Sequence, residues 1–241
     1  MWEDFVMNNE LLLIGSILLI YGGTLVWFYL FGKTGLVCFS VIATIAANIE
    51  VLILVNAFGM EQTLGNVLFA STFLITDILS ELYGKKDAKK AVNIGIMTSI
   101  TFILLSQSWL LFTPSGNDFA MPHISIIFSN TPRLMFASLV VYAISQKFDV
   151  WAYHKWWAYT ERITGDKNRL LWIRNNGSTL ISQVLNTLLY SIFAFYGTYD
   201  TATLISIAWS SYIIFIATSL ADTPAIYLAR FIHKKKELKA S

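Results

Sequence analysis

Seven long apolar stretches constrain the fold of this chain more than any other feature of its sequence. A helix rises about 1.5 Å per residue, so about 20 apolar residues cross the roughly 30 Å hydrocarbon core of a bilayer. Stretches of about this length, bounded by charged or turn-forming residues, lie at 11–31, 36–58, 66–83, 90–112, 129–149, 178–198 and 202–231. The sequence therefore predicts an all-α polytopic membrane protein, a bundle of six to seven transmembrane helices, with a tilt or break near Pro224 in the last.

The composition supports a membrane environment. Apolar residues make up 56% of the 241 residues and charged residues 13%, against roughly 25% charged residues in soluble proteins. The single cysteine, Cys38, lies in an apolar stretch and leaves no partner for a disulfide framework or a cysteine metal site. Glu3, Asp4 and Glu10 precede the first stretch without any Lys or Arg, so we interpret it as a retained span and not a signal peptide. We expect residues 1–241 to form a single integral membrane transport domain.

The basic residues predict the orientation. Sixteen of the 17 Lys and Arg residues lie in the first, third and fifth connections or in the tail, and Arg133 alone begins a span on the other side. Because cytoplasmic loops retain positive charge, the amino terminus is expected outside and the carboxy terminus inside. Residues 150–177, which interleave tryptophans with basic residues, would suit an amphipathic segment at the cytoplasmic interface. Such residues are normal at an inner membrane face, so no nucleic-acid partner is expected.

Several polar residues lie where lipid should exclude them. An ionisable side chain at the bilayer centre costs about 2.5–3.5 kcal/mol on insertion scales, so each one suggests a partner or a function. Counted from the cytoplasmic ends of the spans, the candidates other than Glu81 lie between about 10 Å deep for Asp77 and about 20 Å for Glu50. These depths converge near the midplane, where transporters bind substrate. The candidate substrate-binding residues are Asn48, Glu50, Asp77, Glu81, Gln183, Asn186 and Asp222.

The carboxylates among them differ in their expected roles. Asp77 and Asp222 have no Lys or Arg at similar depth, which favours a role in substrate binding for Asp77 and in coupling or gating for Asp222. Asp222 could instead satisfy the backbone next to Pro224. Glu81 and Asp149 are expected to be shallower, where loop lysines could pair with them, so a salt-bridged helix end and a substrate role remain equally open.

Signatures of an enzyme are absent from the sequence. There is no phosphate-binding glycine loop and no His-Glu-x-x-His zinc motif. The three histidines, His123, His154 and His233, lie in predicted loops or in the tail, which leaves no buried Ser/His pair. We therefore expect no catalytic residues, no metal and no cofactor.

Four sequence segments resemble the queuosine precursor transporter family, also called the vitamin-uptake-transporter-like membrane proteins. The most specific is Thr-Asp-Ile-Leu-Ser-Glu-Leu-Tyr-Gly-Lys-Lys at residues 76–86. The others contain Arg133, Gln146 and Asp149, then Arg174-Asn175-Asn176 with Gln183, and finally the Ala-Asp-Thr-Pro run at residues 221–224. The resemblance covers residues 40–230. One departure is Asn186, where the family pattern has Asp, so a proton-carrying role for this position is in doubt.

The resemblance implies a multi-pass protein of a bacterial inner membrane that imports 7-cyano- and 7-aminomethyl-7-deazaguanine, or queuine, for tRNA modification. Carboxylates and amides such as Asp77, Gln183 and Asn48 could read the polar edge of such a base, while Phe73 or Tyr190 stacks on its ring. The implied partners are the small molecule and the lipid bilayer, without an ATPase subunit. Both a monomer and a homodimer remain open.

Two other functions are compatible with the sequence. The chain could be the substrate-binding subunit of an energy-coupling importer for a vitamin or purine-like solute, which would need a separate ATPase and scaffold. It could also be a membrane enzyme or assembly factor that acts on lipid-embedded substrates. Uptake into vesicles that contain this protein alone separates these alternatives from a self-sufficient transporter.

The predicted orientation can be tested by labelling. A cysteine introduced between residues 84 and 90, in a variant that lacks Cys38, should resist a membrane-impermeant thiol reagent applied to intact cells and react after lysis. A cysteine near Gly116, in the loop expected outside, should react in intact cells. Labelling of the 84–90 loop from outside would reverse the proposed topology.

Overall fold

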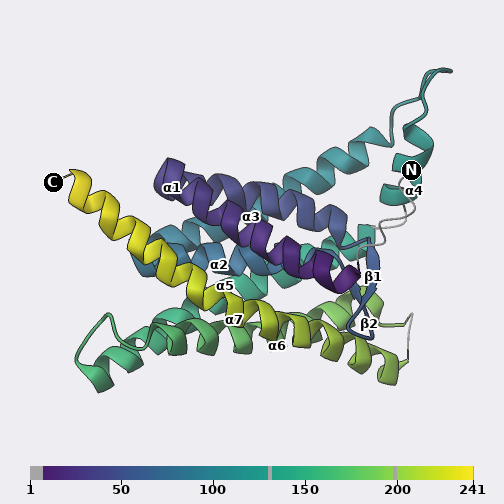
Figure 1. Cartoon of the computed structure of the whole chain (residues 1–241). Coiled ribbons are helices and arrows are strands. Elements are labelled where there is room, and N and C mark those ends of the chain that lie inside the picture. The colour runs from purple at the N-terminus through teal and green to yellow at the C-terminus, as the bar shows by residue number, and fades with distance from the viewer. Residues whose placement is uncertain (1–7, 130–131, 198–199, 241) are drawn as a thin grey trace.

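The computed structural model describes residues 8–129, 132–197 and 200–240 (Figure 1), so Glu3 and Asp4 lie outside the described residues. The elements are α1 (Asn9–Glu50), β1 (Leu54–Ala57), β2 (Met60–Thr63), α2 (Gly65–Tyr83), α3 (Lys85–Trp109), α4 (Met121–Ser129), α5 (Pro132–Thr164), α6 (Leu171–Phe195) and α7 (Thr201–Ala240). Five helices are long and apolar enough to cross a membrane, or six if α4 and α5, bent by 57°, form one span. The predicted all-α polytopic membrane fold is confirmed.

Helix α1 is a pair of antiparallel helices joined at Gly32. The backbone there is not helical (φ 59°, ψ −138°), a conformation that favours glycine. A hydrogen bond shows that the chain returns on itself. The side-chain amide nitrogen of Asn9, near the start of α1, donates to the backbone carbonyl of Asn56, which follows the end of α1, at 2.8 Å. The predicted division between the first two spans is therefore confirmed.

The second span is shorter than predicted. It ends at Glu50 and not at residue 58, because residues 54–63 form a two-stranded antiparallel hairpin. Its turn residues Phe58 and Gly59 both have positive φ, 53° and 71°, as two-residue hairpin turns of the right-handed twist require. The Phe58 backbone N–H donates to the Glu10 carboxylate at 2.8 Å, which ties the hairpin to the first turn of α1.

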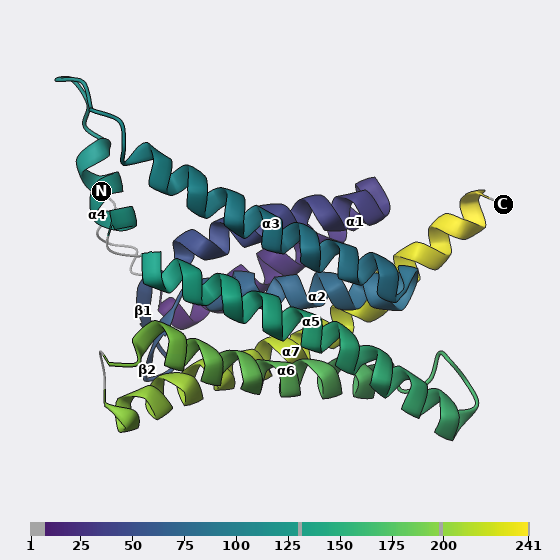
Figure 2. The ribbon, with the colours of Figure 1, turned by 180° about the vertical axis from the view of Figure 1, so that it is seen from behind.

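Helix α2 is the centre of the bundle. In its apolar window 83% of the residues are buried, against 22–44% in the other four span candidates. Its apolar residues, including Leu74 and Ile78, pack in one core with Leu36 of α1, Val92 of α3 and Ile226 of α7. Figures 1 and 2 show α2 enclosed from both sides by the longer helices. Side chains from α2 therefore face the interior of the protein and not lipid.

Helices α5 and α6 differ from their predicted extents. Residues 150–164 continue α5, and residues 171–177 already belong to α6, so no separate interfacial helix lies between them. Both stretches are helical with one face packed inward. Tyr153 is fully buried, whereas Trp151 and Trp172 are exposed. Its place at a membrane surface remains a prediction. Helix α7 runs through Pro224 as one helix, without the expected break.

The two ends of the bundle differ in charge. Lys33 pairs with Asp87 at 3.2 Å near the Gly32 break, and Arg230 contacts Asn168 in the loop between α5 and α6. The hairpin, α4 and the start of α7 lie at the opposite end (Figure 2). We call these the basic end and the hairpin end. Which of them faces the cytoplasm remains a prediction.

A buried ion pair joins four helices at the basic end. Glu81 of α2 accepts two hydrogen bonds from the Arg174 guanidinium of α6, at 2.6 and 2.9 Å, and one from the Tyr153 hydroxyl of α5 at 2.7 Å. Arg230 of α7 approaches the same carboxylate at 3.6 Å. The Arg174 guanidinium lies 4.5 Å from the centre of the Trp157 ring, which covers one face of the ion pair. We call these five residues the Glu81 network.

The close packing of the two halves of α1 gives a stability prediction. A Cβ atom added at Gly35 would lie 2.2 Å from the Trp27 carbonyl oxygen, whereas one added at Gly22 would meet nothing within 4 Å. Gly35→Ala should therefore destabilise the protein by about 1–3 kcal/mol, the usual cost of overpacking. Gly22→Ala is the matched control. Thermal unfolding in detergent measures both, and equal unfolding temperatures would contradict this packing of α1.

Candidate functional site

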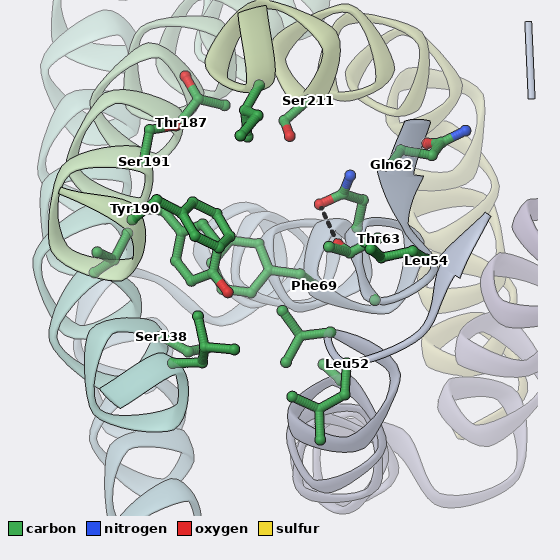
Figure 3. Close-up of a pocket in the computed structure, with 18 of the residues that line it drawn as sticks. Leu52, Leu54, Gln62, Thr63, Phe69, Ser138, Thr187, Tyr190, Ser191 and Ser211 are labelled. Carbon is green, nitrogen blue, oxygen red and sulfur yellow. Dashed lines mark hydrogen bonds between the residues drawn. The ribbon is translucent and has the colours of Figure 1, made fainter. Parts of the chain in front are cut away.

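A cavity of about 400 Å³ lies at the hairpin end (Figure 3). Its walls come from β1, β2, α2, α5, α6 and α7, with the end of α1 and two residues of α4. Ligand sites for small molecules have comparable volumes, so the cavity can hold a compact, drug-sized or smaller solute. Polar lining residues are Glu61, Gln62, Thr63, Asn66, Ser138, Asn186, Thr187, Tyr190, Ser191 and Ser211.

Aromatic side chains form part of the cavity wall. Tyr190 of α6 and Phe69 of α2 project into the same space in Figure 3. The Phe69 ring is held by ring contacts with Tyr142 of α5 at 5.9 Å and with Phe215 of α7 at 6.1 Å. Flat rings fixed in this way offer stacking surfaces to a planar ligand.

Amide groups supply unused hydrogen-bonding capacity. The Asn66 side-chain oxygen accepts a hydrogen bond from the Thr63 hydroxyl at 3.2 Å, while its buried amide nitrogen has no partner in the structure. Gln62 is 4% exposed, and both polar atoms of its side chain are likewise unpartnered. Buried polar groups normally find partners, so unpartnered ones beside a cavity indicate a place for a polar ligand or water.

A second polar layer lies deeper, between the cavity and the Glu81 network. It contains the carboxyls of Asp77, Asp149 and Asp222, each 0–1% exposed. Gln146 of α5 links α5 to α2 in this layer, because its amide nitrogen donates to the Thr72 hydroxyl at 2.7 Å and its oxygen accepts from the Thr76 hydroxyl at 3.2 Å. None of these residues lines the cavity.

The seven sequence-predicted site residues divide into several groups. Asn186 lines the cavity. Asp77, Gln183 and Asp222 are buried in or next to the deeper layer. Their role in substrate binding remains a prediction.

The other three predicted residues lie elsewhere. The Asn48 amide nitrogen donates to the Thr44 carbonyl at 2.8 Å and to the Ser99 hydroxyl at 3.4 Å, which ties α1 to α3. Glu50 is the last residue of α1 and is partly exposed, so it lies at a helix end and not inside a span; its depth in the bilayer remains a prediction. Glu81 belongs to the ion-pair network, with arginines and not the expected lysines as partners.

Sequence reasoning also missed residues of the site. Asp149 was expected at a helix end, but α5 continues to Thr164, which places this carboxyl in the buried layer. Asn66 and Phe69 lie in the predicted span 66–83, and only the position of the hairpin beside α2 shows that they face a cavity. Tyr190 was expected to stack on a ligand, and it does line the cavity; Phe73, the alternative, is fully buried outside it.

The described residues contain no group of three or more His, Cys, Asp or Glu side chains that could hold a metal ion. The three buried carboxyls are thus not arranged as a shared metal site. The cavity lining, the first polar layer, offers hydrogen bonding and stacking. The deeper polar layer offers hydrogen bonding and proton exchange.

Comparison with known proteins assigns the family. Residues 63–229 match the family described as "Putative vitamin uptake transporter", a range that includes the deeper polar layer and most of the cavity lining but not Glu61 or Gln62. The chain is 38% identical over 200 residues, 83% of its length and 85% of the relative's, to "Probable queuosine precursor transporter" of Bacillus subtilis strain 168. It is 25% identical over 163 residues, 67% of its length and 68% of the relative's, to "Queuosine precursor transporter" of Escherichia coli strain K12. No solved structure gives a significant match. With a family match over more than half of its residues, this multi-pass membrane protein belongs to the vitamin uptake transporter family.

Proposed function

We propose that this protein imports queuosine precursors, the 7-deazaguanine bases, and binds them in the cavity at the hairpin end. The observation that carries the proposal is the combination of two aromatic rings with unpartnered amide groups in a cavity of suitable volume, most of whose lining lies in the region that matches the family. The relatives named as queuosine precursor transporters support this choice of substrate.

The chemistry of the cavity fits such a base. A 7-deazaguanine is a flat bicyclic ring with N–H donors and a carbonyl acceptor along one edge. The flat ring can stack on Tyr190 or Phe69, and the edge can pair with amides and hydroxyls of the lining. The unpartnered Asn66 amide nitrogen is suited to donate to the carbonyl of the base. Asn186 offers a neutral amide where the family pattern has a carboxyl.

The asymmetry of the bundle fits an alternating-access transporter. The cavity lies at the hairpin end, whereas the Glu81 network joins α2, α5, α6 and α7 at the basic end. With the basic end inside, as the positive charges predict, the described conformation receives substrate from outside. Release inside then requires the four helices to separate where Glu81 joins them.

Reconstitution of the purified protein alone distinguishes this proposal from the alternatives. Uptake of 7-cyano-7-deazaguanine into proteoliposomes without any ATPase supports a self-sufficient transporter. Tight binding without uptake, with transport restored by an ATP-hydrolysing complex, would assign the chain as a substrate-binding subunit. Guanine serves as the matched competitor, because it shares the polar edge but lacks the 7-substituent.

Tyr190 gives the sharpest test of the binding cavity. Loss of one aromatic stacking partner typically costs about 1–3 kcal/mol per base, so Tyr190→Ala should weaken binding roughly 5- to 150-fold. Tyr227→Ala is the matched control, since Tyr227 is an exposed residue of α7 that does not line the cavity. Titration calorimetry measures both variants. Unchanged affinity in Tyr190→Ala would exclude this cavity as the stacking site.

A further inference from the structure

Three carboxyl groups from three helices meet beneath the cavity. Asp77 comes from α2, Asp149 from α5 and Asp222 from α7, and all are buried. Asp77 and Asp149 both contact α6, at Thr179 and Ser182, which lie three residues apart on that helix. Ionised carboxylates repel one another and are costly in a buried layer, so this arrangement needs compensation.

The hydrogen bonds leave a specific gap between two of these carboxyls. The Thr179 hydroxyl donates to one oxygen of Asp77 at 3.2 Å, and the Ser182 hydroxyl donates to one oxygen of Asp149 at 2.7 Å. The other oxygen of each carboxyl accepts no hydrogen bond from the described residues, and the neighbouring positions of Thr179 and Ser182 on α6 bring the two carboxyls close together. Two ionised carboxylates held close together repel each other, and a proton shared between them removes one of the two charges.

No cation compensates these carboxyls. Among the described residues, no Lys, Arg or His forms an ion pair with Asp77, Asp149 or Asp222. Arg174 and Arg230 of the Glu81 network pair with Glu81 instead. The other titratable groups that face the cluster are hydroxyls: Tyr21 of α1 lies beside Asp222 and donates to the Thr218 carbonyl, and Tyr153 of α5 donates to Glu81.

An unpartnered amide connects this cluster to the cavity. Gln183 is 1% exposed, and neither polar atom of its side chain has a partner. It lies one helical turn from Thr179, which contacts Asp77, and one turn from Asn186 and Thr187, which line the cavity. Neither oxygen of Asp222 accepts a hydrogen bond of normal geometry from the described residues, although the Tyr21 hydroxyl lies beside them. The buried layer thus has spare acceptors and a polar residue on the side that faces the substrate.

We propose that Asp77 and Asp149 form a proton-binding site, separate from the substrate cavity, and that its proton travels with the substrate. One proton enters from the hairpin end past Gln183, bridges the two free carboxyl oxygens, and leaves at the basic end once that end opens. Asp222, next to this pair, is the acceptor to which the proton can move. This inference rests on the proposed transport function and adds the coupling ion to it.

Transport driven by an imposed pH gradient tests the site. The probe is 7-cyano-7-deazaguanine, which is uncharged near neutral pH, so its own titration does not contribute. With the outside one pH unit more acidic and the membrane potential held at zero by valinomycin and equal potassium, a one-to-one symporter should accumulate it about tenfold inside proteoliposomes, since one pH unit corresponds to a tenfold ratio. A protonophore should abolish this accumulation. A sodium gradient at equal pH should not replace the proton gradient.

Asp149→Asn separates coupling from binding. The amide can still accept the Ser182 hydrogen bond, so the variant should keep substrate binding and the exchange of labelled for unlabelled substrate. It should lose accumulation driven by the pH gradient. Asp118→Asn is the matched control, because Asp118 is an exposed carboxyl whose hydrogen bond to the Met121 backbone an Asn can keep. Asp77→Asn repeats the test from the other partner if the first variant does not fold.

Each outcome is informative. Exchange without pH-driven accumulation in the variant, beside normal behaviour of the control, supports the proton site. Wild-type uptake that ignores the pH gradient or follows sodium would overturn it while leaving the transport function intact. Loss of binding in Asp149→Asn or Asp77→Asn would make the carboxyl a substrate ligand instead. Absence of any binding or uptake by the wild-type protein would refute the proposed function itself.

Discussion

The bidentate ion pair between Glu81 and Arg174 is the interaction on which the rest of the bundle depends. Around one carboxylate it gathers α2 and α6 directly, α5 through the Tyr153 hydroxyl and α7 through Arg230. Removing one partner from a buried pair typically costs about 3–5 kcal/mol, because the other charge is left uncompensated. The two polar layers lie in helices that this contact holds together. Its four helices also supply much of the wall of the cavity at the opposite end.

Helix α6 connects the levels of the molecule. Its polar side chains follow one face from the basic end to the hairpin end: Arg174 pairs with Glu81, Thr179 and Ser182 donate to buried carboxyls, and Asn186 and Tyr190 line the cavity. Residues three and four apart share a helix face, so a single straight helix can place these groups in succession. A small rotation of α6 would therefore alter the ion pair, the carboxyl contacts and the cavity together.

Much of the fold could be predicted from the sequence, because lipid requires long apolar helices and the turns between them carry glycine or charge. The division of α1 at Gly32 and the extent of α2 follow directly from these signals. The hairpin of β1 and β2 could not be predicted in this way. The apolar residues 51–58 have the composition of a continued span, and their pairing depends on contacts distant in sequence. Asp149 was misplaced because its depth was counted from an assumed helix end, and only the packing of Tyr153 shows that α5 extends further.

The burial of the Glu81 network affects how the basic end can open. Its two principal side chains are 0% and 3% exposed, so their attraction acts in a poorly screened environment. Once water enters, an exposed ion pair contributes only about 0–1 kcal/mol, and dissolved ions screen it further. A first small separation of the helices therefore weakens most of the attraction that opposes further separation. A partly open basic end is disfavoured relative to a fully closed and a fully open one. In the proposed transport cycle, opening of this end is therefore expected to be all-or-none.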